Sequence, residues 1–473
     1  MTRKFSRRYF IGSLVASAGA AAMAKGKLGG PDLKVGILSD IHLSQPEKHQ
    51  SQGSIDTFKK VLAFFKQEKV DAVLIAGDFT NDGTMTEMRV VVEAWKSVFG
   101  ATGGPEKIWV TGNHERVYFD VAKRQKKLED PAYADGLYNG IERNWQELFG
   151  EKWSPFFIKK VKGYAFVGAH WAEWWERPDE FRAFLAAHKK DLSASKPFFY
   201  TQHAHPQDTC YGKWTWHQWE GGPTTEILAD YPNAVAFSGH THYSITDARS
   251  VWQGAFTSIG TASLRWLAMP AGRENGVIYN GEGQRMGQTY WEPQGMVMSV
   301  WGDRMVFERY DFHNMEKLGD DWDVPVLHGA KDLREFSFEN RRAKSKPPEF
   351  AADAKITVTE REGMSPKTAK LKPEKEKQVV VEFPAAIGAD DLSRVFDYEV
   401  AAEFVEDDCV KAVRTKRVYQ PGVQLNVKRI SPTVTCVFGR GELPDAPFRF
   451  AVTPLNAFGQ RGQTITCRPK LSS

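Results

Sequence analysis

Five apolar runs in the first half of the chain each end in residues that can bind a metal ion. The runs end in Asp40-Ile41-His42, Gly77-Asp78, Gly112-Asn113-His114, His203-Ala204-His205 and Gly239-His240-Thr241-His242. Carboxylate, imidazole and amide groups are ligands of divalent cations such as zinc, manganese and iron. Each short motif alone is common in exposed turns, but five in order, each after a buried run, predict one shared metal centre.

The spacing within two of these motifs has a geometric reading. In extended backbone, successive side chains point to opposite faces, so residues two apart point the same way. We therefore expect Asp40 with His42, and His240 with His242, to reach one cluster from a strand edge. Glycine precedes the ligand in three of the five motifs, which lets the backbone pass close to the ions or to a bound anion.

The elements that must position these residues alternate along the chain. The runs "LKVGILS", "DAVLIAG", "EKIWVTG", "KPFFYTQ" and "NAVAFSG" have the length and composition of buried strands. Residues 54–69 and 84–99 have apolar side chains at helical spacing. Thr84 and Glu87 have the spacing of a capping box at the start of the second of these helices. The alternation predicts an α/β layered core.

The chain changes character after about residue 313. The stretch "RRAKSKPPEF" at 341–350 is rich in charge and proline, as linkers are. It is followed by short alternating runs, namely "KITVTE", "KQVVVEF", "YEVAAEF", "VQLNVKRI", "TVTCVF", "FRFAVTPLNAFG" and "QTITCR". Several strands at this spacing predict an all-β sandwich. We expect a metal-binding domain at 32–315, a linker at 316–352 and a separate sandwich domain at 353–473.

The amino terminus has the pattern of a signal peptide at residues 1–24. Four basic residues precede a weakly apolar segment that ends in Ala22-Met23-Ala24. The stretch Ser6-Arg7-Arg8-Tyr9-Phe10-Ile11 resembles a twin-arginine export signal. A Sec signal is the alternative. We expect export to the periplasm or the medium, with no transmembrane segment in the mature chain, because the segment is too weakly apolar for a membrane anchor.

Charge and cysteine content exclude some partners. The chain has 63 Lys and Arg against 59 Asp and Glu, a net charge of +4. The signal segment holds four basic residues, so the mature chain has 59 of each sign and no overall field for a nucleic-acid polymer. The four cysteines lack CxxC spacing, which argues against a thiolate zinc site. Export permits a disulfide among Cys409, Cys436 and Cys467, with the pairing left open.

The order D-x-H, G-D, G-N-H-E, H and G-H-x-H resembles the calcineurin-like metallophosphoesterase superfamily over residues 33–312. The resemblance implies a four-layer α/β/β/α core with two mixed sheets and a binuclear centre of Mn, Fe or Zn at the strand ends. It implies that Asp40, His42 and His242 hold one ion, that Asn113, His203 and His240 hold the other, and that Asp78 bridges them. His114 would contact the phosphate or its leaving group. His205 is an alternative to His203, which we favour because it comes first after the strand.

The implied chemistry follows from charge. Two divalent ions, the two carboxylates of Asp40 and Asp78, and one bridging hydroxide leave the site positive toward a phosphate anion. Water held by such ions loses a proton near neutral pH, its pKa falling from about 15.7 toward about 7. The hydroxide would attack phosphorus in line, and His114 would stabilise the developing charge or protonate the departing oxygen.

The resemblance therefore implies an exported hydrolase of small-molecule phosphomonoesters or phosphodiesters, with aryl esters and nucleotides among the candidates. The alternative is a non-catalytic, metal-containing binding protein of the cell envelope whose sandwich domain docks a glycan or a protein. The carboxy-terminal stretch "FRFAVTPLNAFGQRG" resembles a late strand and turn of fibronectin type III and immunoglobulin-like sandwiches.

Two subfamily patterns are incomplete in this chain. Purple acid phosphatases have a tyrosine three residues after the bridging aspartate, where this chain has Asn81. Protein serine/threonine phosphatases carry GDxxDRG, whereas residues 77–83 read GDFTNDG. These departures leave open whether Asp82, Glu115 or neither orients His114.

Two segments near the ligands are rich in tryptophan. One holds Trp171, Trp174 and Trp175, and the other holds Trp214, Trp216 and Trp219. Core packing is one interpretation. The other is an aromatic wall for the organic part of a substrate, for which Trp214 and Trp216 are the candidates because they closely follow a proposed ligand.

Overall fold

The computed structural model describes most of the chain beyond the amino-terminal segment. The described residues are 29–44, 51–116, 145–213, 215, 218–270, 272–275, 278–279, 285–286, 292–329, 331–365, 374–406 and 409–471. The predicted signal peptide at 1–24 lies outside them. No helix among the described residues is both long and apolar enough to cross a membrane.

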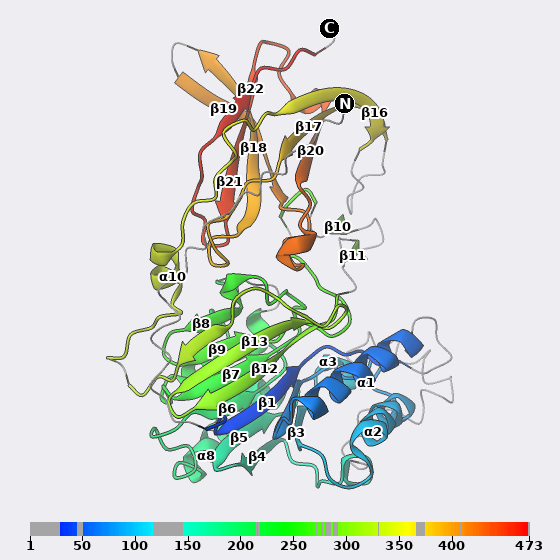
Figure 1. The fold of residues 1–473 in the computed structure, drawn as a ribbon, viewed down its shortest axis with the longest axis vertical. Helices are drawn as coiled ribbons and strands as arrows, with labels where there is room; N and C mark the ends of the chain where they lie inside the picture. The colour runs from blue at the N-terminus through cyan, green and yellow to red at the C-terminus, as the bar shows by residue number, and fades with distance from the viewer. Residues whose placement is uncertain are drawn as a thin grey trace, which may run out of the picture. The chain divides into compact units, whose positions relative to one another are not determined.

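The first sheet of the core is mixed (Figure 1). Its strands run in the order β14-β13-β12-β1-β2-β3, and β15 also pairs with β13. They are β1 (Leu33–Leu38), β2 (Ala72–Ala76), β3 (Glu106–Val110), β12 (Gln294–Trp301), β13 (Arg304–Asp311), β14 (Glu316–Lys317) and β15 (Trp322–Pro325). β1, β2 and β3 are parallel, and β12 joins β1 antiparallel. Residues 316–325, which the sequence pattern assigns to the linker, thus extend this sheet.

The second sheet is also mixed and has the strand order β4-β5-β6-β7-β9-β8. Its strands are β4 (Phe156–Val161), β5 (Tyr164–Ala169), β6 (Phe198–Thr201), β7 (Ala234–Ser238), β8 (Val251–Gln253) and β9 (Thr257–Gly260). The four strands from β5 to β9 are parallel, and the two edge strands are antiparallel.

Successive side chains of the buried strands point to opposite faces of each sheet. One face packs against the other sheet and the opposite face packs against helices, which gives four layers. In β2, Leu74 packs between the two sheets, whereas Val73 and Ile75 pack on the outer side with the helices. In β6, Phe199 faces the other sheet and Tyr200 faces outward. Parallel strands covered on both faces are expected to be apolar throughout, as these are.

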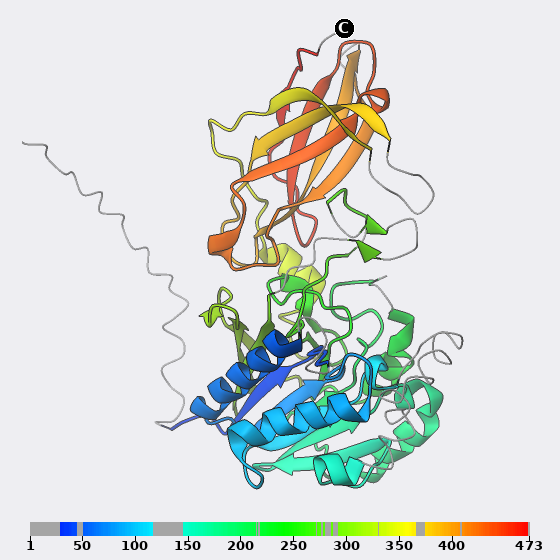
Figure 2. The same ribbon diagram turned by 90° about the vertical axis from the view of Figure 1, so that its right-hand side faces the viewer.

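Helices cover the outer face of each sheet. α1 (Ser51–Gln67) and α2 (Met85–Phe99) lie side by side over the first sheet (Figure 2). α7 (Glu173–Glu176), α8 (Pro178–Ala187) and α9 (Thr224–Leu228) pack on the second. Thr84 and Glu87 form the predicted capping box at the start of α2. The predicted four-layer α/β/β/α core is confirmed.

The carboxy-terminal region is an all-β sandwich, as predicted. One sheet has β16 (Thr357–Met364), β17 (Lys375–Pro384) and β20 (Thr433–Gly439), and the other has β19 (Cys409–Tyr419), β18 (Val395–Glu406), β21 (Arg449–Asn456) and β22 (Ile465–Cys467). All of these strands pair antiparallel. Apolar side chains from both sheets, such as Val381 and Val452, share one core.

The remaining described elements are short. They are α3 (Asn113–Arg116), η2 (Gln218–Gly221), η3 (Ala248–Ser250), β10 (Ile278–Tyr279), β11 (Arg285–Met286), α10 (Phe338–Lys344), η4 (Val427–Arg429) and η5 (Arg440–Glu442).

The structure of the sandwich domain differs from the sequence-based expectations in three respects. Residues 423–430 form turns and the short helix η4 instead of a strand, because the Asn426 side chain accepts a hydrogen bond from the backbone N–H of Lys428 and caps that helix. The sequence pattern does not predict β19, because four basic residues interrupt its apolar positions and its first seven residues are exposed. In the described part of the chain all four cysteines are free, so no disulfide links Cys409, Cys436 and Cys467.

Candidate metal centre

The five ligand motifs follow the carboxyl ends of strands in both sheets. Asp40 and His42 follow β1, Asp78 follows β2, Asn113 and His114 open α3 after β3, His203 follows β6, and His240 and His242 follow β7. Carboxyl ends of parallel strands meet at one edge of a sheet. The two sheets pack face to face, so the two sets of loops meet as well.

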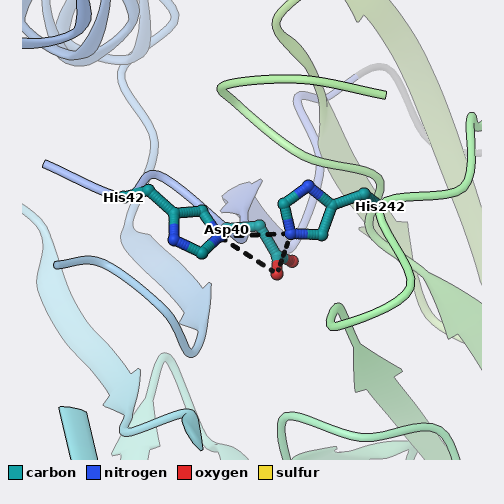
Figure 3. A group of neighbouring side chains, drawn as sticks. All are labelled: Asp40, His42 and His242. Atoms are coloured by element: carbon teal, nitrogen blue, oxygen red, sulfur yellow. Dashed lines mark hydrogen bonds and ion pairs between the residues drawn. The ribbon is translucent and has the colours of Figure 1, made fainter. Parts of the chain in front are cut away.

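Asp40, His42 and His242 form the first group (Figure 3). The Oδ1 atom of Asp40 lies 3.0 Å from the Nε2 of His242 and 3.9 Å from the Nε2 of His42. The two imidazole Nε2 atoms are 3.1 Å apart. All three residues are buried. The ligand atoms therefore converge on one point, as the atoms around a bound cation do.

Asp78, His203 and His240 form the second group. The Oδ2 atom of Asp78 lies 3.1 Å from the Nε2 of His203, and that nitrogen is 3.2 Å from the Nδ1 of His240. The same Oδ2 atom is 3.8 Å from the Nε2 of His42 in the first group. Asp78 thus lies between the two groups, in the place of a carboxylate shared by two cations.

The backbone at these ligands is not extended, which corrects the reasoning from period two. Asp40 and His42 have φ of 50° and 48°, Asp78 has 50°, and His240 and His242 have 67° and 56°. These values lie in the left-handed region, which Asp and His enter more readily than most residues. The paired ligands converge because each strand ends in left-handed turns. Such conformations cost of order 1–3 kcal/mol each and gather at functional sites.

Hydrogen bonds on the outer side of the rings assign their tautomers. The Nδ1 of His203 lies 2.7 Å from the backbone oxygen of Ala76, and the Nδ1 of His242 lies 2.9 Å from that of Trp266. A carbonyl only accepts, so each Nδ1 carries the proton, and in the neutral rings the Nε2 lone pairs face the centre. Neutral imidazoles with inward lone pairs beside two carboxylates fit divalent cations.

The pKa shifts of Asp40 and His203 agree with a site that fits divalent cations. Burial alone would raise the pKa of Asp40, but His242 and His203 hold it below its usual value. Burial lowers the pKa of His203, yet Asp78 and Asp40 outweigh it and raise that pKa to about 10. The two carboxylates therefore favour positive charge at this position.

The amide of Asn113 provides an independent sign that the site fits a cation. Its Oδ1 atom is buried and has no hydrogen-bond partner among the described residues. A buried amide oxygen without a partner costs roughly 1–3 kcal/mol, and an oxygen ligand to a cation removes that cost. Asn113 lies between Gly112, which touches Asp78, and His114, whose N–H donates to Asp78 Oδ1 at 2.9 Å.

His114 lies at the mouth of the centre and is oriented by a backbone carbonyl. Its Nδ1 is 2.5 Å from the oxygen of Asn81, and its Nε2 is 3.9 Å from Asp78 Oδ2. Its side chain is 30 % exposed, whereas the Asp78 side chain is 2 % exposed. Burial lowers the pKa of His114, but Asp78, the Asn81 carbonyl and Glu115 outweigh it and raise the pKa above its usual value.

Glu115 supports the loop of the bridging carboxylate and does not orient His114. Its Oε2 accepts from the N–H groups of Asp78 at 3.0 Å and Gly112 at 2.6 Å, and its Oε1 accepts from the N–H and hydroxyl of Thr80, both at 2.8 Å. Burial and the charge of Asp78 raise its pKa to about 7. The orienting group left open by the sequence is thus the carbonyl of Asn81.

The structure separates the two candidates that follow β6. His203 belongs to the second group of ligands, whereas His205 belongs to neither group among the described residues. The Nε2 of His205 lies 3.2 Å from the hydroxyl of Thr241, and burial lowers its pKa to about 3. His205 is therefore a neutral packing residue in this structure.

Two glycines keep room for the ligands. A Cβ on Gly112 would lie 2.1 Å from Asp78 Oδ1, and one on Gly239 would lie 2.2 Å from Asp40 Oδ2. No carbon can approach an oxygen so closely. The sequence predicts that the glycines before the ligands admit ions or an anion. In the structure, Gly112 makes room for the carboxylate of Asp78 and Gly239 makes room for that of Asp40.

The first tryptophan-rich segment packs into the core, whereas Trp219 of the second segment is exposed. Trp171 and Trp174 are buried in the outer layer of the second sheet, and Trp175 packs beside them. Trp214 and Trp216, the substrate candidates, lie outside the described residues. Trp266, which sequence reasoning missed, packs its ring 4.5 Å from His42 and 4.4 Å from His242, measured between ring centroids.

Residues 33–244 match the family model of the calcineurin-like phosphoesterases, so the predicted resemblance is confirmed. A comparison with curated proteins found no match.

Several solved structures match the chain at low sequence identity. A dimetal phosphatase from Danio rerio is 11% identical with a TM-score of 0.38, over 63% of this chain and 99% of that chain. The purple acid phosphatase PPD1 from yellow lupin is 13% identical with a TM-score of 0.42, over 62% and 53%. GAP50, described as the anchor in the inner membrane complex of Plasmodium, is 14% identical with a TM-score of 0.35, over 62% and 89%.

Proposed function

We propose that the chain is an exported phosphoesterase that uses two divalent ions to hydrolyse phosphomonoesters or phosphodiesters of small molecules. The observation that carries the proposal is the position of the Asp78 carboxylate between two groups of imidazole nitrogens, 3.8 Å from His42 and 3.1 Å from His203. A pair of ions a few ångströms apart is the arrangement that two-metal phosphatases use. The family match over residues 33–244 supports the same reaction class.

Each ion would be held by ligands of one group. Asp40, His42 and His242 would hold the first ion, and Asp78 would hold both. His203, His240 and the Oδ1 of Asn113, which has no partner among the described residues, would hold the second. Two ions bound here would supply Lewis-acid stabilisation of phosphate charge and a nucleophile made from water near neutral pH. Mn, Fe and Zn all suit this mixture of imidazole and oxygen ligands.

His114 would act on the substrate. The Asn81 carbonyl fixes its ring through Nδ1, so Nε2 is the free nitrogen, and the partly exposed ring is within reach of a bound phosphoester. Protonated, Nε2 can donate a hydrogen bond to a phosphate oxygen or a proton to the departing alkoxide. The Asp78 carboxylate, 3.9 Å away, favours the protonated ring.

The organic part of the substrate would lie near Trp266. The indole ring packs against His42 and His242 of the first group and is partly exposed. An aromatic surface beside the ligands favours aryl esters or nucleotides over simple sugar phosphates, because stacking adds to the buried area. The twin-arginine-like stretch at residues 6–11 supports export to the periplasm or the medium.

A metal-reconstitution assay tests the proposed activity. Protein stripped of metal would be assayed with para-nitrophenyl phosphate and bis-para-nitrophenyl phosphate, before and after addition of Mn²⁺, Zn²⁺ or Fe²⁺. We expect turnover of at least one ester that depends on added metal, and the preferred ester separates monoesterase from diesterase activity. Two bound ions without turnover of either ester would contradict the proposal and favour a metal-containing binding protein.

A further inference from the structure

Glu220 contacts a metal-ligand candidate although no motif marks it. It lies in the short helix η2, in the second tryptophan-rich segment. Its Oε2 atom is 2.5 Å from the Nε2 of His240, and the side chains of the two residues are 11 % and 7 % exposed. Twenty positions separate them in the chain, so only the fold brings them together.

This contact decides which nitrogen of His240 faces the centre. A carboxylate accepts the Nε2 proton of the neutral ring, so the lone pair of His240 is on Nδ1. That Nδ1 atom is 3.2 Å from the Nε2 of His203, in the second group of ligands. The other tautomer would turn an N–H toward this group and remove His240 as a ligand.

Glu220 carries a negative charge, unlike the backbone groups that orient the rings of His203 and His242. Backbone carbonyls of Ala76 and Trp266 hold the outer nitrogens of His203 and His242. The partner of His240 is instead a nearly buried carboxylate. A carboxylate on the far nitrogen of a ligating imidazole makes the ring a more basic ligand, and its loss typically lowers metal affinity about 10- to 100-fold.

The tryptophan-rich segments hold Glu220 in place. The indole Nε1 of Trp174 donates to the backbone oxygen of Glu220 at 2.9 Å. A Cβ on Gly221 would lie 2.1 Å from the backbone oxygen of His205, and one on Gly222 would lie 2.7 Å from the Cβ of Trp175. Glycine at positions 221 and 222 therefore allows η2 to pack closely against the loop after β6 and against Trp175.

We propose that Glu220 is a positioning residue that fixes His240 in the metal-binding tautomer and strengthens its hold on the ion of the second group. The inference rests on the metal centre proposed above. It also assigns a purpose to the first tryptophan-rich segment, which supports the carboxylate instead of binding substrate.

The test compares Glu220→Ala and Glu220→Gln with the wild-type chain. The matched control is Glu226→Gln, because Glu226 follows closely in sequence and its side chain is 81 % exposed. Zn²⁺ affinity would be measured by chelator competition, the visible spectrum with Co²⁺ would report coordination, and the unfolding temperature of metal-free protein would report the fold. No readout depends on hydrolysis.

We expect Glu220→Ala to lose about 10- to 100-fold in affinity for one of the two ions, with the other ion unchanged. Glu220→Gln should recover part of the loss, because its amide oxygen still accepts from Nε2–H. The Co²⁺ spectrum should change only in the Glu220 variants. If Glu220→Ala binds both ions with wild-type affinity, the inference about Glu220 is overturned and the proposed metal centre still stands. Equal loss of both ions with early unfolding would also overturn the inference about Glu220, whereas a wild-type chain that binds no ions would overturn the metal centre as well.

Discussion

The Nδ1 atom of His114 lies 2.5 Å from the backbone oxygen of Asn81, three residues beyond the aspartate between the two ligand groups. The loop that carries Asp78 thus also sets the direction of the His114 ring. Because a backbone group supplies the contact, the Asn81 side chain has no part in it. The metal binding proposed for Asp78 and the substrate contact proposed for His114 would therefore be coupled through one short loop.

The first prediction is that His114→Asn keeps both ions and loses rate. If His114 acts on the substrate as proposed, its removal should lower kcat about 10²- to 10⁴-fold, the scale of a positioned acid. Metal analysis and kinetics on the same sample would check this. Asn81→Ala is the control and should be close to wild type, since the orienting carbonyl remains. Loss of an ion in His114→Asn would instead make His114 a ligand.

A second prediction separates His203 from His205. His203→Ala should deplete one ion, because its Nε2 is 3.1 Å from Asp78 Oδ2. His205→Ala should retain both ions, because His205 contacts the hydroxyl of Thr241 and joins neither ligand group. Metal content by mass spectrometry distinguishes them. Depletion in the His205 variant with normal content in the His203 variant would reverse the assignment.

A third prediction concerns Gly112. A methyl group at this position would meet the Asp78 carboxylate at 2.1 Å, so Gly112→Ala should displace Asp78 and lower both metal content and activity. Gly441→Ala is the control, since a Cβ there has nothing within 4 Å. Normal metal content in Gly112→Ala would show that the loop moves without disturbing the centre.

A fourth prediction concerns substrate preference. Trp266→Ala should reduce the preference for aryl over glycerol phosphoesters about two- to twelve-fold in kcat/KM, which corresponds to stacking of roughly 0.5–1.5 kcal/mol. The backbone oxygen that holds His242 is unchanged by the substitution, so metal content should persist. Trp301→Ala, at an exposed tryptophan on β12, is the control. An unchanged ratio of the two substrates would exclude Trp266 from the pocket.

Much of the core and of the ligand set could be predicted from the sequence, because the buried strands are apolar runs and each ligand follows one directly. Glu220 and Trp266 could not, since they reach the centre through loops whose paths depend on tertiary packing. The Asn81 contact is made by a backbone atom, which has no sequence signal. The spacing of two residues also predicts the wrong backbone conformation at Asp40 and His242. Both residues have positive φ where extended chain is expected.

The central claim is that Asp78 joins two ions in one hydrolytic centre, and metal stoichiometry measured together with phosphoester turnover tests it most directly. The wild-type chain should bind two divalent ions and hydrolyse a nitrophenyl ester. Asp78→Asn should bind one ion or none and lose hydrolysis, because a neutral amide cannot balance two dications. Two tightly bound ions with full activity in Asp78→Asn would contradict the account.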